Sequence, residues 1–142
     1  MSSALGFTRV DHVAIRVSDY DATIAFYTDT LGFEVSKEWT LPEALPGARF
    51  AYVALGSFEV EVIAGGQLTT IVPTLDVADH LGRGGYGHLC LRVEDLDATV
   101  AGLKDKGVAI LAEPFEVEPI GQRLAMIHDN SGNIIELAQA TA

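Results

Sequence analysis

The chain has 142 residues, about the length of one domain, and its 20 acidic and 9 basic residues give a net charge of −11. This acidic balance argues against nucleic acid or an anionic membrane as the partner. No apolar stretch is long enough to span a bilayer, and the single cysteine, Cys90, cannot form an internal disulfide, which favours a reducing cytoplasm. Cys90 stands between Leu89 and Leu91, where a free thiol is usually a small buried apolar group.

The first half of the sequence occurs a second time. From His12 the chain reads HVAIRVSDYDATIA, and 76 positions later, from His88, it reads HLCLRVEDLDATVA, with eight of the fourteen positions identical. Near the ends of the copies, Glu61 in FEVEV corresponds to Glu136 in NIIEL. A fixed internal period indicates a structural repeat. We therefore predict one domain over 1–142, with repeat one at about 8–64, a linker at about 65–86 and repeat two at about 87–140.

Repeat one is predicted to fold as βαβββ. Apolar and polar residues alternate from His12 to Val17, as in a strand with one covered face. A helix follows, with Ser18 or Asp19 as its N-cap and Gly32 as its C-cap. Three further strands are expected at 33–39, 49–55 and 58–63, the last two joined by a tight turn at 56–57.

Repeat two should build the same unit from His88 onward. We expect a helix at about 96–106 that ends at Gly107, and a hairpin turn at 129–132. Strands are expected near 108–112, 124–128 and 133–138. The segment 64–87 between the repeats is rich in glycine and polar residues and has no counterpart in the repeat, so it is interpreted as a linker. The fold class is α+β, with two βαβββ repeats forming a curved sheet around a cleft.

The repeat predicts a metal site. In each unit the helix covers one face of the sheet, so the opposite face, with the His of the first strand and the Glu of the fourth, stays open. A pseudo-two-fold arrangement of the units then brings together His12, Glu61, His88 and Glu136. Imidazole and carboxylate together suit one divalent Ni, Zn, Co, Mn or Fe ion, whereas calcium prefers more oxygen ligands.

Each of these residues also has a structural interpretation, since a lone His or Glu in a sheet is more often a hydrogen-bonded or ion-paired residue than a ligand. Their recurrence at matched places favours the metal site. His80, in the linker, and His128, beside a turn, lack that support and are interpreted as solvated or structural. Arg16 and Arg92 share the face of the two histidines and are candidates to hold an anionic part of a small-molecule substrate, with a solvated or salt-bridged role as the alternative.

The segments HVAIRVSDYDATIAFYTDTLGFEV, GYGHLCLRVEDLDA and HDNSGNIIEL resemble the vicinal oxygen chelate superfamily over nearly the whole chain. That superfamily includes glyoxalase I, methylmalonyl-CoA epimerase, extradiol dioxygenases and the fosfomycin and bleomycin resistance proteins. The resemblance places the metal ligands of the glyoxalase I branch on His12, Glu61, His88 and Glu136. It also matches Arg16 to an arginine that contacts glutathione in that branch, and it implies a homodimer.

The chain departs from the glyoxalase I branch at two places. Glu61 is followed by Val-Ile-Ala-Gly-Gly rather than by an Asn-Trp-Gly segment, and the stretch 112–118, AEPFEVE, is an acidic loop where that branch has basic residues. The linker is also longer than in the compact lyases, and resembles that of epimerase-like relatives whose halves pair within one chain. We accordingly expect the two units to pair within one chain and leave the use of glutathione open.

The expected function is that of a metal-dependent lyase or isomerase of an α-oxygenated carbonyl compound, acting through a metal-bound enediolate, with Glu136 or Glu61 as the base. One alternative is an epimerase acting next to a thioester, although such relatives commonly carry an amide where Glu61 stands. A second is an extradiol-type dioxygenase, which needs three open iron positions. A third is a binding protein for a small molecule such as an antibiotic; the binding relatives generally lack the metal residues.

Overall fold

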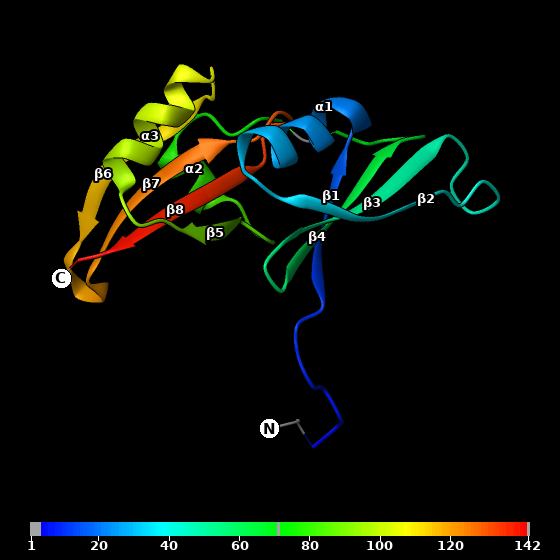
Figure 1. Cartoon of the computed structure of the whole chain (residues 1–142), viewed down its shortest axis with the longest axis horizontal. Helices are drawn as coiled ribbons and strands as arrows, with labels where there is room; N and C mark the ends of the chain where they lie inside the picture. The colour runs from blue at the N-terminus through cyan, green and yellow to red at the C-terminus, as the bar shows by residue number, and fades with distance from the viewer. Residues whose placement is uncertain (1–3, 71, 142) are drawn as a thin grey trace. The chain divides into compact units, whose positions relative to one another are not determined.

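The computed structural model describes residues 4–70 and 72–141. The chain divides between Thr69 and Thr70 into two compact units, and each is considered by itself. Figure 1 shows a four-stranded sheet with its own helix in each unit. The α+β class and the repeat of the βαβββ unit are confirmed. Within the described ranges, no helix is long and apolar enough to cross a membrane.

The sheet of unit 1 has the strand order β1-β4-β3-β2. Its strands are β1 (His12–Val17), β2 (Glu34–Trp39), β3 (Ala48–Leu55) and β4 (Phe58–Gly65). The edge strand β1 runs parallel to β4, and the remaining pairs are antiparallel. The first and last strands of the repeat are therefore hydrogen-bonded neighbours, which brings residues far apart in the sequence to the same place in the sheet.

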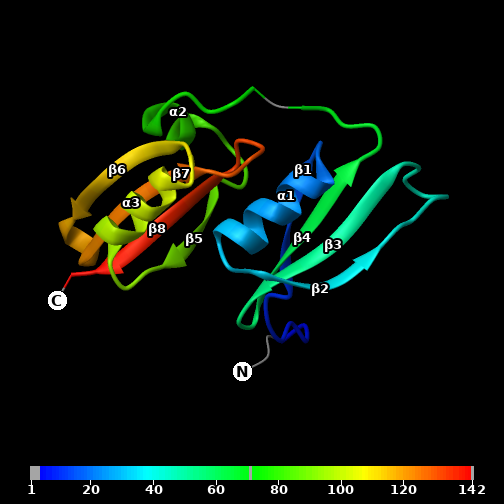
Figure 2. The same ribbon diagram turned by 45° about the horizontal axis from the view of Figure 1, so that its top comes forward.

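The helix of unit 1 begins where the sequence predicts. The carboxylate of Asp19 accepts a hydrogen bond from the backbone N–H of Ala22 at 3.0 Å, as an N-cap does. Helix α1 (Tyr20–Ala25) continues into a π-helical turn, Phe26–Thr30, and packs against β4 (Figure 2). Gly32 then takes a positive φ of 81°, which glycine adopts without strain.

Unit 2 repeats this plan with the strand order β5-β8-β7-β6. Its strands are β5 (His88–Arg92), β6 (Ile110–Val117), β7 (Gln122–His128) and β8 (Ile134–Ala140). Helix α3 (Leu96–Asp105), capped by the carboxylate of Asp95, packs against β6, β7 and β8. A short 3₁₀ turn, Glu118–Ile120, links β6 to β7. The parallel β5–β8 pair corresponds to the β1–β4 pair of unit 1.

Unit 2 also differs from the sequence-based expectation at three places. The linker contains a helix, α2 (Val77–Gly82), which begins at an Asp76 cap. The acidic stretch 112–118 lies in β6 and the turn after it rather than in a loop, because β6 extends to Val117 along β7. Cys90 is exposed, since it shares the face of His88 and Arg92 rather than the helix-covered face of Leu89 and Leu91.

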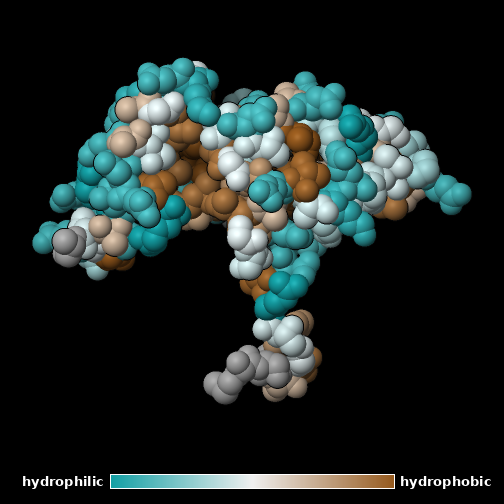
Figure 3. Space-filling model, in the orientation of Figure 1, coloured by the Kyte–Doolittle hydropathy of each residue, from teal (hydrophilic) through white to brown (hydrophobic). Residues whose placement is uncertain are grey.

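Alternation along the inner strands separates the core from the predicted ligands. In β4, Val60 and Val62 are fully buried on either side of Glu61. In β8, Ile135 and Leu137 flank Glu136 in the same way. Apolar residues also gather over β7 and β8 in Figure 3, whereas the outer surface of α3 is mainly hydrophilic. Each glutamate is thus fixed in a rigid strand and points away from the helix-side core.

Candidate metal and active site

The first predicted ligand pair is in contact within unit 1. His12 begins β1, and Glu61 lies in the neighbouring β4, where its Cα is registered opposite Ala14. The Nε2 atom of His12 lies 2.9 Å from Oε2 of Glu61, and the two side chains are 29% and 16% exposed. The parallel pairing of the first and fourth strands therefore makes one half-site, with both groups still open to a ligand.

The second pair has the same construction in unit 2. Glu136 in β8 is registered opposite Cys90, the position that corresponds to Ala14. The Nε2 atom of His88 lies 3.4 Å from Oε2 of Glu136, and the two side chains are 27% and 16% exposed. Equivalent strand positions thus carry equivalent side chains with nearly equal exposure, as the sequence repeat predicts.

The other ring nitrogen of each histidine has a different partner. Nδ1 of His12 lies 2.9 Å from the carboxylate of its neighbour Asp11, and this hydrogen bond, followed by the Glu61 charge, raises the pKa of His12. Nδ1 of His88 lies 2.9 Å from Nε2 of His80. Burial, and then the charge of His88, lowers the pKa of His80, a residue that is 6% exposed. His80 is therefore a buried residue in contact with a predicted ligand, a contact that the repeat does not indicate.

An aromatic wall stands beside the first pair. Tyr52 in β3 is registered opposite Glu61, and its ring centroid lies 5.2 Å from that of His12. The Trp39 ring follows at 4.8 Å from Tyr52. Desolvation, and then the Glu61 carboxylate, raises the pKa of Tyr52, which therefore keeps its hydroxyl proton near neutral pH. Sequence analysis did not single out either ring, because the register of β3 against β4 is not visible in a local pattern.

The two candidate substrate arginines are held differently. The terminal nitrogens of Arg16 donate to the carbonyl oxygens of Val17, Ile63 and Gln67 at 3.0 to 3.1 Å, and also to that of Gly65. Arg92 donates from Nη1 to the side-chain oxygen of Gln122 at 3.0 Å. Arg16 thus ties the end of β1 to β4 and the segment after it, while Arg92 is exposed.

Cys90 and His128 are two further residues of unit 2 that the sequence singled out. Cys90 lies beside Glu136, and desolvation together with a hydrogen bond to that carboxylate raises the pKa of the thiol to about 11, so it stays protonated near neutral pH. His128, at the end of β7, is half-buried, and its backbone N–H donates to the carbonyl of Ala109 at 3.0 Å.

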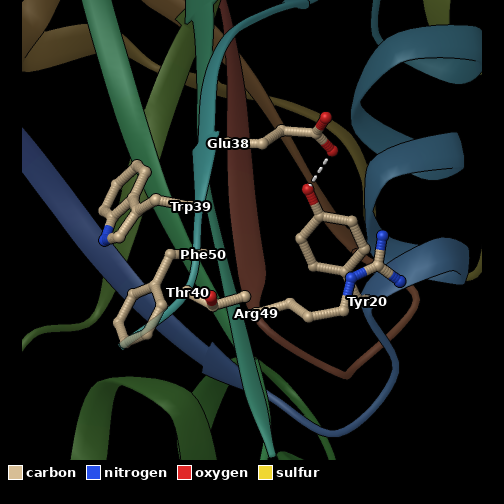
Figure 4. A pocket seen from close by; sticks show the side chains of 6 residues that line it. All are labelled: Tyr20, Glu38, Trp39, Thr40, Arg49 and Phe50. Carbon is tan, nitrogen blue, oxygen red and sulfur yellow. Dashed lines mark hydrogen bonds between the residues drawn. The ribbon is translucent and has the colours of Figure 1, made fainter. Parts of the chain in front are cut away.

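A shallow hollow of about 240 Å³ in unit 1 has neither His12 nor Glu61 in its lining. Its lining consists of Tyr20, Glu38, Trp39, Thr40, Arg49 and Phe50 (Figure 4). The Tyr20 hydroxyl donates to Glu38, and the Arg49 guanidinium lies 3.8 Å over the Tyr20 ring. Burial and the Glu38 hydrogen bond raise the pKa of Tyr20 to about 12. These mutual contacts fasten α1 to β2 and β3, so the hollow has a structural explanation.

The kinds of donor atom in the two His–Glu pairs suit a divalent ion of intermediate softness. Each half-site offers one imidazole nitrogen and one carboxylate, which are ligands for Ni, Zn, Co, Mn or Fe. Among residues 4–70 and 72–141, no group of three or more His, Cys, Asp or Glu side chains is close enough to hold a metal ion. Neither unit alone therefore supplies a complete four-ligand set.

The family model described as the Glyoxalase/Bleomycin resistance protein/Dioxygenase superfamily matches residues 9–137. The mitochondrial methylmalonyl-CoA epimerase of Bos taurus is 32% identical over 134 residues, which cover 93% of this chain and 74% of that protein. A protein of Synechocystis sp. named "Probable lactoylglutathione lyase" is 32% identical over 131 residues, which cover 92% of this chain and 95% of that protein.

Solved structures agree with the sequence relatives. The glyoxalase family protein from Enterococcus faecalis matches with a TM-score of 0.76 and 28% identity, over 94% of this chain and 98% of that one. The trypanothione-dependent glyoxalase I of Leishmania major matches with a TM-score of 0.68 and 28% identity, over 92% of this chain and 85% of that one. The relatives include enzymes named for two different reactions, a lyase and an epimerase.

Proposed function

The chain belongs to the Glyoxalase/Bleomycin resistance protein/Dioxygenase superfamily, and from that premise we propose that it is a metal-dependent enzyme that transfers a proton at a carbon next to a carbonyl group. The preferred candidate is a lyase or isomerase that resembles glyoxalase I. One observation carries the proposal: two His–Glu pairs, with N–O distances of 2.9 and 3.4 Å, stand at equivalent strand positions of the two units.

We propose that His12, Glu61, His88 and Glu136 together hold one divalent ion. Two imidazoles and two carboxylates would leave positions on the ion open for substrate oxygens. When bound, such an ion supplies Lewis acidity to a carbonyl oxygen and so favours loss of the neighbouring proton. The rigid β4 and β8 strands hold the carboxylates in place, so little reordering is needed when the ligands engage.

Glu136 is the proposed base and Glu61 the proposed alternative. Proton transfer requires a group that reaches the substrate, and both carboxylates are 16% exposed on the face away from the helix. The contact of Glu136 with His88, at 3.4 Å, is looser than the contact of Glu61 with His12, at 2.9 Å. We prefer Glu136 as the base because the resemblance to epimerases implies an amide at the place of Glu61, whereas Glu136 keeps its carboxylate.

Arg92 is the stronger of the two proposed anion contacts. Its guanidinium is exposed on the face of His88, and planar guanidinium groups bind carboxylates and phosphates through paired hydrogen bonds. Arg16 already donates to four backbone carbonyls, so any contact with substrate would use its remaining donor. We propose Arg92 for the anionic end of the substrate, with Arg16 shaping the site from the other unit.

An epimerase acting next to a thioester is the second candidate. It is supported by the 32% identity to the bovine methylmalonyl-CoA epimerase over 93% of the chain. The carboxylate of Glu61 favours the lyase, because the resemblance to epimerases implies an amide at that place. Both candidates require the same proton transfer and differ in the substrate, so one experiment addresses both.

The test follows hydrogen exchange at the substrate α-carbon in deuterated water, with a divalent ion added. α-Oxoaldehyde–thiol adducts and acyl-CoA thioesters are compared on wild type, Glu136→Gln and Glu61→Gln. We expect exchange with one substrate class, and a loss of about 10²- to 10⁴-fold when the base is replaced, because a general base contributes on that scale. Glu34→Gln, a carboxylate change on the exposed face of β2, is the matched control and should keep full activity.

The outcomes separate the candidates. Exchange with the thiol adduct supports the lyase, and exchange with the acyl-CoA supports the epimerase. Exchange at the wild-type rate in both Gln variants would remove these carboxylates from the mechanism. No exchange with either class would favour a small-molecule binding protein.

A further inference from the structure

We propose that His80, in the helix between the repeats, is a positioning residue for the ligand His88. This inference rests on the proposed function, because it assigns His80 the task of orienting one ligand of the proposed site. The observation that carries it is the 2.9 Å contact between Nε2 of His80 and Nδ1 of His88. The two rings lie 5.2 Å apart between centroids, at 45° to each other.

The single proton of a neutral imidazole determines which of the two rings donates this hydrogen bond. A neutral imidazole carries one proton, so a histidine that binds an ion through Nε2 must carry its proton on Nδ1. Nδ1 of His88 then donates to Nε2 of His80, which accepts. This hydrogen bond holds the His88 ring at one rotation, with Nε2 on the side of Glu136. Metal-bound histidines commonly need such a partner on their second nitrogen.

A comparison of the repeats shows why the second unit needs a partner from outside the repeat. In unit 1, Asp11 precedes the ligand and its carboxylate contacts Nδ1 of His12 at 2.9 Å. In unit 2 the corresponding position is Gly87, which has no side chain. The space is used by His80: a Cβ atom at Gly87 would lie 3.4 Å from Cε1 and 3.7 Å from Nε2 of its ring. The imidazole of His80 thus replaces the missing carboxylate at the same nitrogen.

Hydrogen bonds and an ion pair of the neighbouring residues restrain the segment that carries His80. Asp79 accepts from the backbone N–H of Leu75 at 2.9 Å and pairs with Arg83 at 2.7 Å. Arg83 also donates to the carbonyl oxygens of Val72 and Pro73, the latter at 3.1 Å. These bonds fasten the chain before α2 to the end of α2, and His80 is 6% exposed. A buried, fastened ring limits the motion of its hydrogen-bonded partner.

Two substitutions separate the hydrogen bond from the packing. His80→Met fills a similar volume but removes the acceptor, and His80→Gln provides an amide oxygen near the place of Nε2. Ni²⁺ affinity is measured by titration calorimetry on the purified full chain. We expect His80→Met to lower the affinity about 10- to 100-fold, the usual effect of removing such a partner, and His80→Gln to recover most of it. Val100→Ala, a core change on α3, should lower the unfolding temperature of the ion-free protein without changing the affinity.

A measurement on the unmutated protein makes the test independent of folding of the variants. In ¹⁵N-labelled, Zn²⁺-loaded wild type, Nδ1 of His88 should be protonated and should show a coupling through the hydrogen bond to Nε2 of His80. A His88 that is protonated on Nε2 instead, or an affinity unchanged in His80→Met, would overturn the positioning role while leaving the proposed function intact. Failure of the wild type to bind either ion would overturn both.

Discussion

His12 and His88 occupy the same position in the two repeats, yet different chemistry contacts their second ring nitrogen. An exposed carboxylate, Asp11, contacts Nδ1 of His12, and a buried imidazole, His80, contacts Nδ1 of His88. The His–Glu pairs recur in both units, whereas the groups around them differ. In the second unit the partner, His80, comes from the segment that the repeat does not include.

The surroundings of the pairs differ in a second way. Tyr52 stands opposite Glu61 in β3, and Met126 stands opposite Glu136 in β7. On the helix side the repeat is better preserved: Arg49 pairs with Asp21 in unit 1, and Arg123 pairs with Asp97 in unit 2. The ion pair between strand and helix therefore occurs in both units. The residues opposite Glu61 and Glu136 differ between the units.

The largest expected effect comes from removing both histidines. We expect the wild type to hold about one divalent ion per four-ligand set, and the double change His12→Ala, His88→Ala to abolish binding, because each half-site loses its nitrogen ligand. Equilibrium dialysis with metal analysis measures this directly. Tight binding that survives the double change would place the ion elsewhere in the protein.

Complementation tests where the two half-sites pair. If the units pair within one chain, a mixture of His12→Ala and His88→Ala proteins has no intact four-ligand set and should remain without activity. In the swapped arrangement, one of the two sites in a mixed dimer keeps all four ligands, and up to about half of the mixed dimers' activity should return. Refolding the two variants together, with each refolded alone as control, distinguishes these outcomes. We predict pairing within one chain, so rescue on mixing would contradict it.

Substitutions of Asp11 and His80 compare how much each partner of a histidine Nδ1 atom contributes to ion affinity. We expect Asp11→Ala to weaken ion binding about 10-fold, at the lower end of the usual range, because the Asp11 side chain is 64% exposed and water can replace it. Adding Gly87→Asp to His80→Met copies the first half-site into the second and should restore affinity. Calorimetric titration of the three proteins measures both effects. An Asp11→Ala loss larger than the His80→Met loss would reverse the ranking of the partners.

The smallest expected effect concerns the duplicated ion pair. Arg123 donates two hydrogen bonds, of 2.9 and 3.0 Å, to Asp97, and these lower the pKa of that carboxyl from its ordinary 3.8. A folded-state pKa below the unfolded one adds stability above the unfolded value and loses it as pH falls through the folded value. Asp97→Asn should therefore slightly lower the unfolding temperature near neutral pH, and this difference should vanish in strong acid.

The matched change in unit 1 is Asp21→Asn, which removes a single contact of 3.1 Å to Arg49. Its effect on the unfolding temperature should be smaller than that of Asp97→Asn, because one exposed hydrogen bond is lost rather than two. Thermal unfolding of both variants and wild type across the acid range measures the difference. A larger effect for Asp21→Asn would show that the two ion pairs are not ranked by their hydrogen bonds.

Several features of the molecule follow from local sequence signals. The alternating strands, the Asp19 cap and the turn at Gly56 are set by neighbouring residues, and the structure confirms them. The two His–Glu contacts also follow from the sequence, because the repeat aligns the first and last strands of each unit and side-chain parity places the ligands on one face. The exposure of Cys90 follows from the same parity, so its assignment to the core, made from its apolar neighbours, was wrong.

Tertiary structure alone decided which group contacts the second nitrogen of His88 and which ring stands beside His12. The place of His80 depends on α2, a helix of six residues that is too short to show a clear helical period and has no repeated counterpart. Tyr52 contacts His12 because β3 pairs with β4 in one particular register. Such contacts join residues distant in the chain, and they form only when the strands and the linker have packed, so no local pattern encodes them.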